Sequence, residues 1–286
     1  MKVTWEEAGW EQLTPRVGRR RLPVWDCTVG LVVGEGGALI VDAGSSLAEG
    51  ARLRGEAQTL AGRRVTFLAL THPHFDHVFG AAAFAGAEVL VAGGSAEVYE
   101  CGREGLYADA VRCGLDARAA EEAADTLVLP RNYVWGTWHL ELTGGVEVLL
   151  VRMGEGHTAH DLVVVVPGDP TVVFCGDLVE ESGEPQAGPD AVPSRWPGAL
   201  DRLLALGGED ALYVPGHGAV VDAGFVRSQR DALAARFGVP GSATPGFDPP
   251  GSATPGFATP GFGASGFAPP GSATPGFGAS DFGVSR

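Results

Sequence analysis

The sequence predicts a layered α/β domain over residues 1–238 and a separate low-complexity tail over residues 239–286. Short apolar runs rich in β-branched residues recur along the first segment, which is typical of buried strands. Helical patterns lie between several of these runs, and helices packed on a sheet define the α/β class. The composition changes abruptly near Val239, where glycine and proline become dominant. The domain boundary is therefore expected at that point.

Nine of the apolar runs are predicted strands. They are residues 28–33, 38–42, 65–70, 87–92, 138–142, 146–153, 162–167, 171–175 and 211–215. The runs within 138–153 and within 162–175 form two hairpin-like pairs, and strands joined by short turns pair antiparallel. We therefore expect sheet pairing of mixed direction, with helices covering the strands.

Four segments are predicted helices, at residues 46–62, 117–127, 196–206 and 225–237. The first follows Ser45 or Ser46, and either hydroxyl suits an N-cap. Pro197 lies in the first turn of the third helix, where its missing N–H group is tolerated.

The tail repeats the unit GSATPGF at residues 241–247, 251–257 and 271–277. Its glycine and proline content disfavours helix and strand interiors, and it has no apolar periodicity. We therefore expect it to be disordered. Its recurrent phenylalanines indicate either weak association with a protein partner or with other copies of the chain, or a repeat expansion that is merely tolerated.

The composition argues against several classes of partner. A net charge of -15 and a pI of about 4.8 are unlike a polyanion-binding protein, because phosphate backbones are bound by clustered Lys and Arg. The one basic run, Arg19 to Arg21, is short. No stretch has the roughly 18 apolar residues of a membrane span, and the acidic start lacks the apolar segment of a signal peptide. The four cysteines contain no C-x-x-C pair, so we expect reduced thiols and a cytoplasmic location. From the charge and the lack of a long apolar stretch, we expect no nucleic-acid or membrane partner.

Ligand-type residues follow the predicted strands at five places, usually beside glycine. The stretch THPHFDHVFG, residues 71–80, alone contains three histidines and an aspartate. The candidate metal ligands are His72, His74, Asp76, His77, His157, Asp177 and His217, and Asp42 ends a further strand. Because α/β sheets place their chemistry in loops at strand ends, we expect these side chains to converge.

The candidates comprise five imidazoles and two carboxylates. One ion of the zinc type takes about four ligands, and a catalytic site keeps one position for water. Seven protein ligands are too many for one such ion and suit two ions. A carboxylate has two oxygens, so one aspartate can serve both.

The order of these motifs resembles that of the metallo-β-lactamase superfamily. The resemblance covers roughly residues 28–222 and rests on VDAG (41–44), THPHFDH (71–77), GHT (156–158), GD (176–177) and PGHG (215–218). It implies a four-layer αββα sandwich with the metals at one edge of two facing sheets. It also implies that one ion is bound by His72, His74 and His157, the other by Asp76, His77 and His217, with Asp177 bridging them. By the same resemblance, Asp42 lies behind the metals and orients the histidine loop through hydrogen bonds.

Two such ions predict a hydrolase. Metal binding lowers the pKa of water from about 15.7 to near 7, so that a metal-bound hydroxide is available at neutral pH. Asp76 is the candidate catalytic residue, placed to orient this hydroxide as well as to bind metal. Two divalent ions give +4, while Asp76, Asp177 and hydroxide give -3, and the remainder of +1 suits an ester, thioester, lactone or anionic acyl group. Zinc is the expected metal, and iron or manganese also fit these ligands.

Two details narrow the class of hydrolase. The best-known β-lactamases of this fold carry cysteine where this chain has Asp177, and Cys175 is predicted to lie in the core, so β-lactam hydrolysis is not the expected activity. The glyoxalase-like thioesterases share the aspartate and the GHT motif, but Ala159 and His160 replace their usual Pro-Gly, which counts against glutathione thioesters. His160 is expected either as a proton donor at the rim of the pocket, or as a residue that lies behind the metal ligands or only packs.

Residues 180–196 form a long, turn-rich segment after the bridging aspartate, and loops of this length are usually functional. We expect it to lie over the metals, where Arg195 and Trp196 are candidates to contact substrate. The alternative for Trp196 is that it packs at the start of the next helix. Two alternatives stay open. One is a mononuclear iron dioxygenase of the same fold that oxidises sulfur compounds, and the other is a scaffold protein that acts through its tail. The complete ligand set favours the hydrolase.

Overall fold

The computed structural model describes residues 3–239, and its strands form two sheets. The predicted tail, apart from Val239, lies outside the described residues. The first sheet has seven strands in chain order: β1 (Glu11–Thr14), β2 (Val17–Arg21), β3 (Thr28–Val33), β4 (Ala38–Val41), β5 (Val65–Ala69), β6 (Glu88–Ala92) and β7 (Asn132–Val134). Neighbours are antiparallel from β1 to β4 and parallel from β4 to β7.

The second sheet has five strands in the order β12-β11-β10-β9-β8. They are β8 (Thr137–Leu142), β9 (Val146–Gly154), β10 (Asp161–Val166), β11 (Val172–Glu180) and β12 (Leu212–His217). The β8–β9 and β10–β11 pairs are antiparallel, as the two hairpin patterns predicted, and β11 pairs with β12 in parallel.

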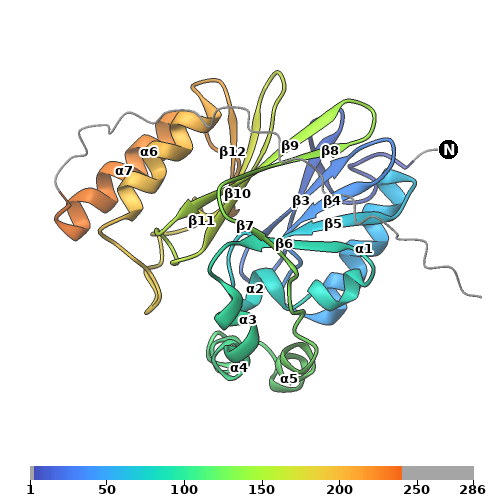
Figure 1. Ribbon diagram of the computed structural model, residues 1–286, viewed down its shortest axis with the longest axis horizontal. Helices are drawn as coiled ribbons and strands as arrows, with labels where there is room; N and C mark the ends of the chain where they lie inside the picture. The colour runs from blue at the N-terminus through green and yellow to red at the C-terminus, as the bar shows by residue number, and fades with distance from the viewer. Residues whose placement is uncertain (1–2, 240–286) are drawn as a thin grey trace, which may run out of the picture. The chain divides into compact units, whose positions relative to one another are not determined.

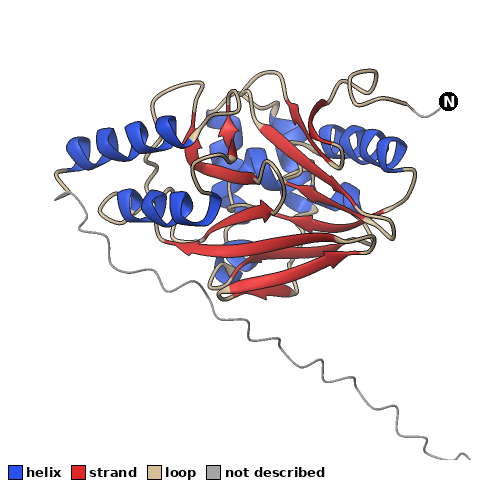
Figure 2. Ribbon diagram, turned by 90° about the horizontal axis from the view of Figure 1, so that it is seen from above, coloured by secondary structure: helices blue, strands red, loops and turns tan. Residues whose placement is uncertain are grey.

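The helices cover the outer faces of the sheets. They are α1 (Leu47–Ala61), α2 (Phe75–Val78), α3 (Ala96–Cys101), α4 (Arg103–Arg112), α5 (Ala117–Asp125), α6 (Trp196–Gly207) and α7 (Ala223–Phe237), with a 3-10 turn, η1 (Ala81–Phe84). Helix α1 packs on β4 and β5, while α6 packs on β9 and β11 and against α7 (Figure 1). Seen from above, the strands lie between helices (Figure 2). The predicted four-layer αββα sandwich is therefore confirmed.

Three hydrophobic clusters correspond to the three contacts between these layers. Along β10, Val164 faces the cluster between the sheets, whereas Val163 and Val165 face the cluster under α6 and α7. Side chains of a strand alternate between faces, so a strand covered on both sides is apolar throughout. This burial explains the unbroken apolar runs from which the strands were predicted.

Several elements were not predicted from the sequence: β1, β2, β7 and helices α2 to α4. Strand β2 contains the basic run, and its arginines are held by acidic neighbours: Arg19 by Glu11, Arg20 by Glu56 and Arg21 by Asp26. Strand β11 extends to Glu180, beyond the predicted end at residue 175. Within residues 3–239, no helix is both long and apolar enough to cross a membrane.

Candidate metal centre

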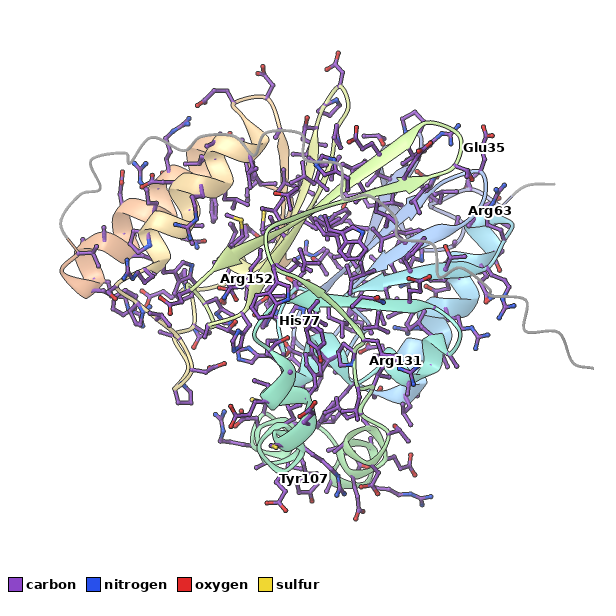
Figure 3. All side chains as sticks on the ribbon, viewed as in Figure 1. Glu35, Arg63, His77, Tyr107, Arg131 and Arg152 are labelled. Carbon is purple, nitrogen blue, oxygen red and sulfur yellow. The ribbon has the colours of Figure 1, made fainter. Side chains whose placement is uncertain are left out.

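The predicted ligands lie at one edge of the two sheets, where strands end. His77 lies on α2 after β5, His157 follows β9, and His217 ends β12. Figure 3 shows His77 in the interior of the molecule, whereas Glu35 and Arg63 lie at its periphery. Two glycines make room for the site: Gly176 has a φ of 54°, and a side chain at Gly216 would overlap the carboxylate of Asp177. A left-handed φ strongly favours glycine, because other residues clash there.

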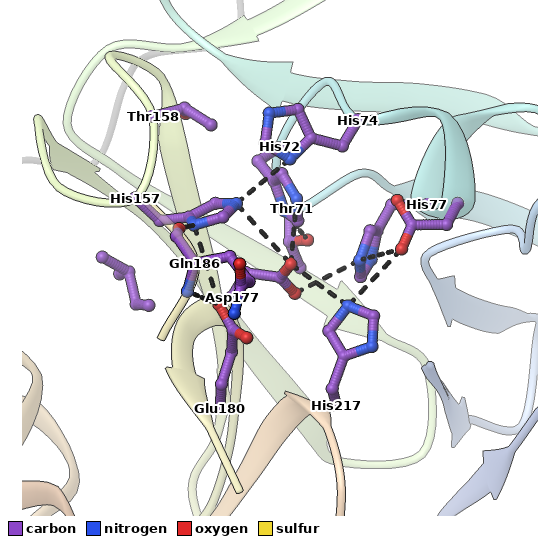
Figure 4. A network of polar contacts seen from close by, with 12 residues as sticks. Thr71, His72, His74, His77, His157, Thr158, Asp177, Glu180, Gln186 and His217 are labelled. Carbon is purple, nitrogen blue, oxygen red and sulfur yellow. Dashed lines mark hydrogen bonds and ion pairs between the residues drawn. The ribbon is translucent and has the colours of Figure 1, made fainter. Parts of the chain in front are cut away.

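All seven predicted ligands come together, in two groups. The first is His72, His74, His157 and Asp177, and the second is Cys27, Asp76, His77 and His217. Within each group the potential ligand atoms all lie within 4.8 Å of one another. Asp177 lies between the groups (Figure 4): its Oδ2 is 3.6 Å from His72 Nε2 and its Oδ1 is 3.2 Å from His77 Nε2.

Each of the five imidazoles has one ring nitrogen hydrogen-bonded to an outer group. The outer partners are Thr71 Oγ1 for His72 Nδ1, Asp190 for His74 Nε2, Asp42 for His77 Nδ1, the Gln186 carbonyl for His157 Nδ1 and the Trp25 carbonyl for His217 Nδ1. A carbonyl or carboxylate accepts a hydrogen bond from that nitrogen, and Thr71 Oγ1, which donates to Asp42, accepts a hydrogen bond from His72. When a ring is neutral, its other nitrogen therefore presents a lone pair to the interior of the cluster.

The inward-facing atoms fit metal ions better than they fit one another. His74 Nδ1 and His157 Nε2 lie 3.1 Å apart, although the outer partners leave a lone pair on both. His72 Nε2, His77 Nε2 and Asp177 Oδ1 are buried and have no hydrogen-bond partner among the described residues. Buried polar atoms are almost always paired, so this concentration of unpaired acceptors calls for cations. Imidazole and carboxylate are the ligands that zinc-type ions prefer.

The charges of the cluster are balanced by protons. Burial lowers the pKa of His157 to about 4 and holds that of His72 well below its ordinary value. Burial would also lower the pKa of His217, but the Asp177 carboxylate raises it to about 9. Burial opposes ionisation of Asp177, yet the neighbouring imidazoles, His217 foremost, hold its pKa well below the ordinary range. Metal ions would take the place of the protons on these imidazoles.

Asp42, the aspartate of the VDAG motif, supports the cluster from behind. It is buried and accepts hydrogen bonds from Thr71 N at 2.8 Å, from Thr71 Oγ1 at 2.8 Å and from His77 Nδ1 at 2.9 Å. Its φ of 64° is one that Asp and Asn adopt more readily than other side chains. One carboxylate thereby fixes the start of the 71–77 segment and the tautomer of His77.

The turn that carries His157 is held by a second buried carboxyl group. Asp161 accepts hydrogen bonds from Thr158 N at 3.0 Å and from Thr158 Oγ1 at 2.7 Å. Burial raises the pKa of Asp161 to about 7. On the other side of the ring, Trp196 packs edge-on against His157, with ring centroids 5.3 Å apart.

A cavity of about 750 Å³ opens onto the cluster. Five of the predicted ligands reach it: His74, Asp76, His157, Asp177 and His217. The segment between β11 and α6 forms one wall, with residues 182–184 and 186–190, as expected for a loop over the metals. Trp25 and Phe75 form an aromatic wall, with ring centroids 5.4 Å apart, and α4 contributes its C-terminal turn.

Three residues that the sequence connected with the site do not line this cavity within the described chain. Trp196 is fully buried and donates a hydrogen bond to the Leu178 carbonyl at 3.0 Å, so it packs at the helix start. Arg195 lies beside Glu155 in a separate, smaller pocket. The ring of His160 lies against Gly94, and its Nδ1 is buried without a hydrogen-bond partner there. It lies neither at the cavity rim nor against the clustered histidines.

Three residues of the site belong to no recognisable sequence motif. Cys27 joins the second group of ligands, Asp190 accepts from His74, and Glu180 accepts from Gln186 N at 2.9 Å, which places the carbonyl that His157 uses. Burial and the nearby Asp177 raise the pKa of Glu180 to about 8. Only the length of the loop pointed toward two of them, because it contains Asp190 and begins at Glu180. Cys175, predicted to lie in the core, does so beneath α6 and α7.

Comparisons with known proteins agree with this arrangement. The family model of the metallo-β-lactamase superfamily matches residues 22–217. A metallo-β-lactamase from Pontibacter korlensis superposes with a TM-score of 0.58 at 21% identity, over 78% of this chain and 98% of that one. The FIM-1 metallo-β-lactamase of Pseudomonas aeruginosa, in its mono-zinc form, superposes with a TM-score of 0.60 at 18% identity, over 81% and 96%. No curated protein sequence matches significantly.

These structural likenesses show a shared fold, and the family match extends across every motif of the cluster, from the strand before Asp42 to His217. The match covers more than half of the chain, and the histidine and aspartate cluster provides the candidate metal-binding residues that the family requires. The chain therefore belongs to the metallo-β-lactamase superfamily and is a metal-dependent hydrolase of that fold.

Proposed function

We propose that the centre holds two divalent ions and that the enzyme hydrolyses an ester, thioester or lactone of a small molecule. The position of Asp177 is the observation that carries this proposal. Its Oδ2 is 3.6 Å from His157 Nε2 in one group and 3.2 Å from His217 Nε2 in the other, so one carboxylate faces both groups. Four ligand-type residues in each group are what two zinc-type ions need, not one.

Bound ions would supply hydroxide at neutral pH and polarise the carbonyl of the substrate. The chain's own contribution is to position these reactants. Asp76 Oδ2 lies 3.4 Å from His217 Nε2, so its carboxylate can bind the same ion as His217. Asp76 also lines the cavity, where its carboxylate can accept the proton of a water molecule. His72 and His77 are buried behind it and keep their orientation through Thr71 and Asp42.

The walls of the cavity favour a neutral substrate. Carboxylates line it at Asp109, Glu184 and Asp190, and its one arginine, Arg112, is bonded to Asp109 at 2.9 Å. An anionic substrate would meet like charges before it reached the metals, and such contacts are unfavourable. The aromatic wall offers apolar contact to an acyl chain or ring. Neutral esters, thioesters and lactones are therefore favoured over the anionic acyl groups that the charge of the metals alone would admit.

A matched pair of variants tests the proposal. Asp76→Asn keeps the shape of the side chain but loses charge and lone pairs, so turnover of the zinc-loaded enzyme should fall by at least about a hundredfold. The control is Asp210→Asn, which makes the same chemical change at an exposed residue before β12 and should leave turnover unaltered. Neutral esters and lactones should be turned over faster than analogues that carry a carboxylate.

Two outcomes would contradict the proposal. Undiminished turnover by Asp76→Asn would show that this carboxylate does not orient the attacking water. A single iron per chain, with oxygen uptake on sulfur substrates and no hydrolysis, would favour the mononuclear dioxygenase instead.

A further inference from the structure

We infer that Cys27 supplies its sulfur to the ion held by Asp76, His77 and His217, so that this half of the centre is a mixed sulfur, nitrogen and oxygen site. The inference rests on the proposed two-ion centre. It adds to that centre a donor that lies within the family match, which begins at residue 22, but in none of the five motifs that carried the resemblance.

The spacing of the four side chains is that of ligands around one small ion. Cys27 Sγ lies 3.2 Å from Asp76 Oδ2, and it lies 3.7 Å from His217 Nδ1 and 4.0 Å from His217 Nε2. Asp76 Oδ2 in turn lies 3.4 Å from His217 Nε2 and 3.7 Å from His77 Nε2. Tetrahedral bonds of about 2.0–2.3 Å place neighbouring ligand atoms about 3.3–3.8 Å apart. The observed separations cluster around that range.

A second observation points into the same space. His77 is fully buried, and its Nε2 has no hydrogen-bond partner among the described residues, while its Nδ1 is engaged by Asp42. This nitrogen lies 3.2 Å from Asp177 Oδ1 and faces a point that the sulfur, Asp76 and His217 also surround. A core thiol would require none of these polar neighbours.

The backbone holds Cys27 against His217. The two residues form an isolated antiparallel bridge, and the Trp25 carbonyl accepts the hydrogen bond of His217 Nδ1 at 2.7 Å. The Asp26 carbonyl accepts from Gly218 N at 3.2 Å. The segment before β3 is thereby fixed to the end of β12, and Cys27 is only 2% exposed. Its sulfur cannot swing into the solvent.

A thiolate at this position changes which metal the site selects. Thiolate ligands favour zinc, whereas a set of carboxylates and water suits manganese. The other half of the centre has three imidazoles and a carboxylate but no sulfur. We therefore expect the two halves to differ, with the Cys27 half discriminating more strongly in favour of zinc.

Cobalt(II) binding tests this assignment without reference to activity. Cobalt bound to thiolate shows an intense sulfur-to-metal charge-transfer band in the near ultraviolet. The full-length protein loaded with two cobalt ions should show that band, and Cys27→Ser should lose it. The control is Cys175→Ala, because Cys175 is equally buried but donates only to the Val173 carbonyl, and this variant should keep the band. In Cys27→Ser, the ratio of zinc affinity to manganese affinity at one of the two ion sites should also fall by on the order of tenfold.

The outcomes separate this inference from the two-ion proposal. Two cobalt ions bound without a charge-transfer band in the parent protein would overturn the role of Cys27 and leave the two-ion centre intact. A band that persists in Cys27→Ser would assign the sulfur to another cysteine and would equally overturn it. One cobalt per chain with the band present would support Cys27 but contradict the proposed function. Circular dichroism and melting temperature of Cys27→Ser and of Cys27→Ala show whether a lost band reflects unfolding.

Discussion

Replacing Asp42 by asparagine should weaken metal binding without touching a metal ligand. Asparagine tolerates the φ of 64° at this position and can keep the bond from Thr71 N through its carbonyl oxygen. Its amide nitrogen, however, would replace Oδ2, which now accepts from Thr71 Oγ1 at 2.8 Å and from His77 Nδ1 at 2.9 Å. The Thr71 hydroxyl and the His77 Nδ1–H group would then both face an N–H donor instead of an acceptor. His77 can relieve this only by moving its proton from Nδ1 to Nε2, the nitrogen that faces the cluster.

The magnitude follows from the bonds that are lost. A hydrogen bond to a charged group contributes about 1.5–3 kcal/mol, and 1.4 kcal/mol corresponds to about tenfold in affinity. We therefore expect the ion beside His77 to bind about 10–100-fold more weakly in Asp42→Asn, which is also the usual effect of removing a partner of a metal-bound histidine. The ion held by the other group should change far less, because none of its imidazoles bonds to Asp42 directly.

Competition with a chromophoric chelator measures both dissociation constants, and circular dichroism confirms that the variant is folded. Asp190→Asn is the matched comparison, since Asp190 accepts from His74 Nε2 at 3.0 Å but its side chain is 45% exposed, so water can replace it. Its effect should be below tenfold and confined to the other ion. Unchanged binding in Asp42→Asn, or a larger loss in Asp190→Asn, would refute the view that Asp42 sets the tautomer of His77.

Three further predictions follow from the structure. His217→Ala should lower the bound metal, measured by inductively coupled plasma mass spectrometry, from two ions per chain toward one. If the parent protein and the variant both hold a single ion, the bridging role of Asp177 is contradicted. Burial raises the pKa of Asp161 in the folded chain to about 7 against an ordinary 3.8, so between about pH 4 and pH 7 the folded chain holds a proton that the unfolded chain has lost, and stability falls as pH rises through that range. At about 1.4 kcal/mol per pH unit, the free energy of unfolding measured by denaturant titration should fall by about 4 kcal/mol relative to Asp161→Asn across that range, and a parallel pH profile in both proteins would exclude it. A chain ending after Val239 should keep its melting temperature, metals and turnover, and if deletion changes any property it should be association, measured by sedimentation or partner pull-down. Lost turnover with metals intact would instead place the tail in the substrate site.

The sequence predicted best those strands whose two faces are both buried. Strand β3 was predicted with its observed bounds, since packing on both faces leaves an uninterrupted apolar run. Strand β2 was missed because Arg19, Arg20 and Arg21 interrupt any such run. The acidic partners that hold these arginines lie outside β2, so the strand sequence alone does not show them. Helices α3 and α4 were missed because few of their residues are buried, so they present little apolar periodicity.

The residues of the site also fall into those that a local sequence pattern reveals and those that it does not. The histidines and aspartates of the motifs were found because each belongs to a local pattern beside a glycine turn. Cys27 and Asp190 were not, because their partners are distant in sequence: Asp76 is 49 residues from Cys27, and His74 is 116 residues from Asp190. Only tertiary contact identifies such residues.

The two halves of the centre are held by different parts of the fold. His77 and His217 bond to Asp42 and to the Trp25 carbonyl, which lie on segments fixed by the sheets. His74 and His157 instead bond to Asp190 and to the Gln186 carbonyl, both on the segment that lines the cavity. A molecule that displaces this segment therefore also displaces the partners of two imidazoles, while the opposite half stays in place. On the other side, Trp25 also lines the cavity, but its backbone carbonyl is held by the pairing of the segment before β3 with the end of β12, so substrate contact and metal geometry are coupled more closely on the side of His74 and His157. The comparison of Asp190→Asn with Asp42→Asn tests how strongly each half depends on its outer partners.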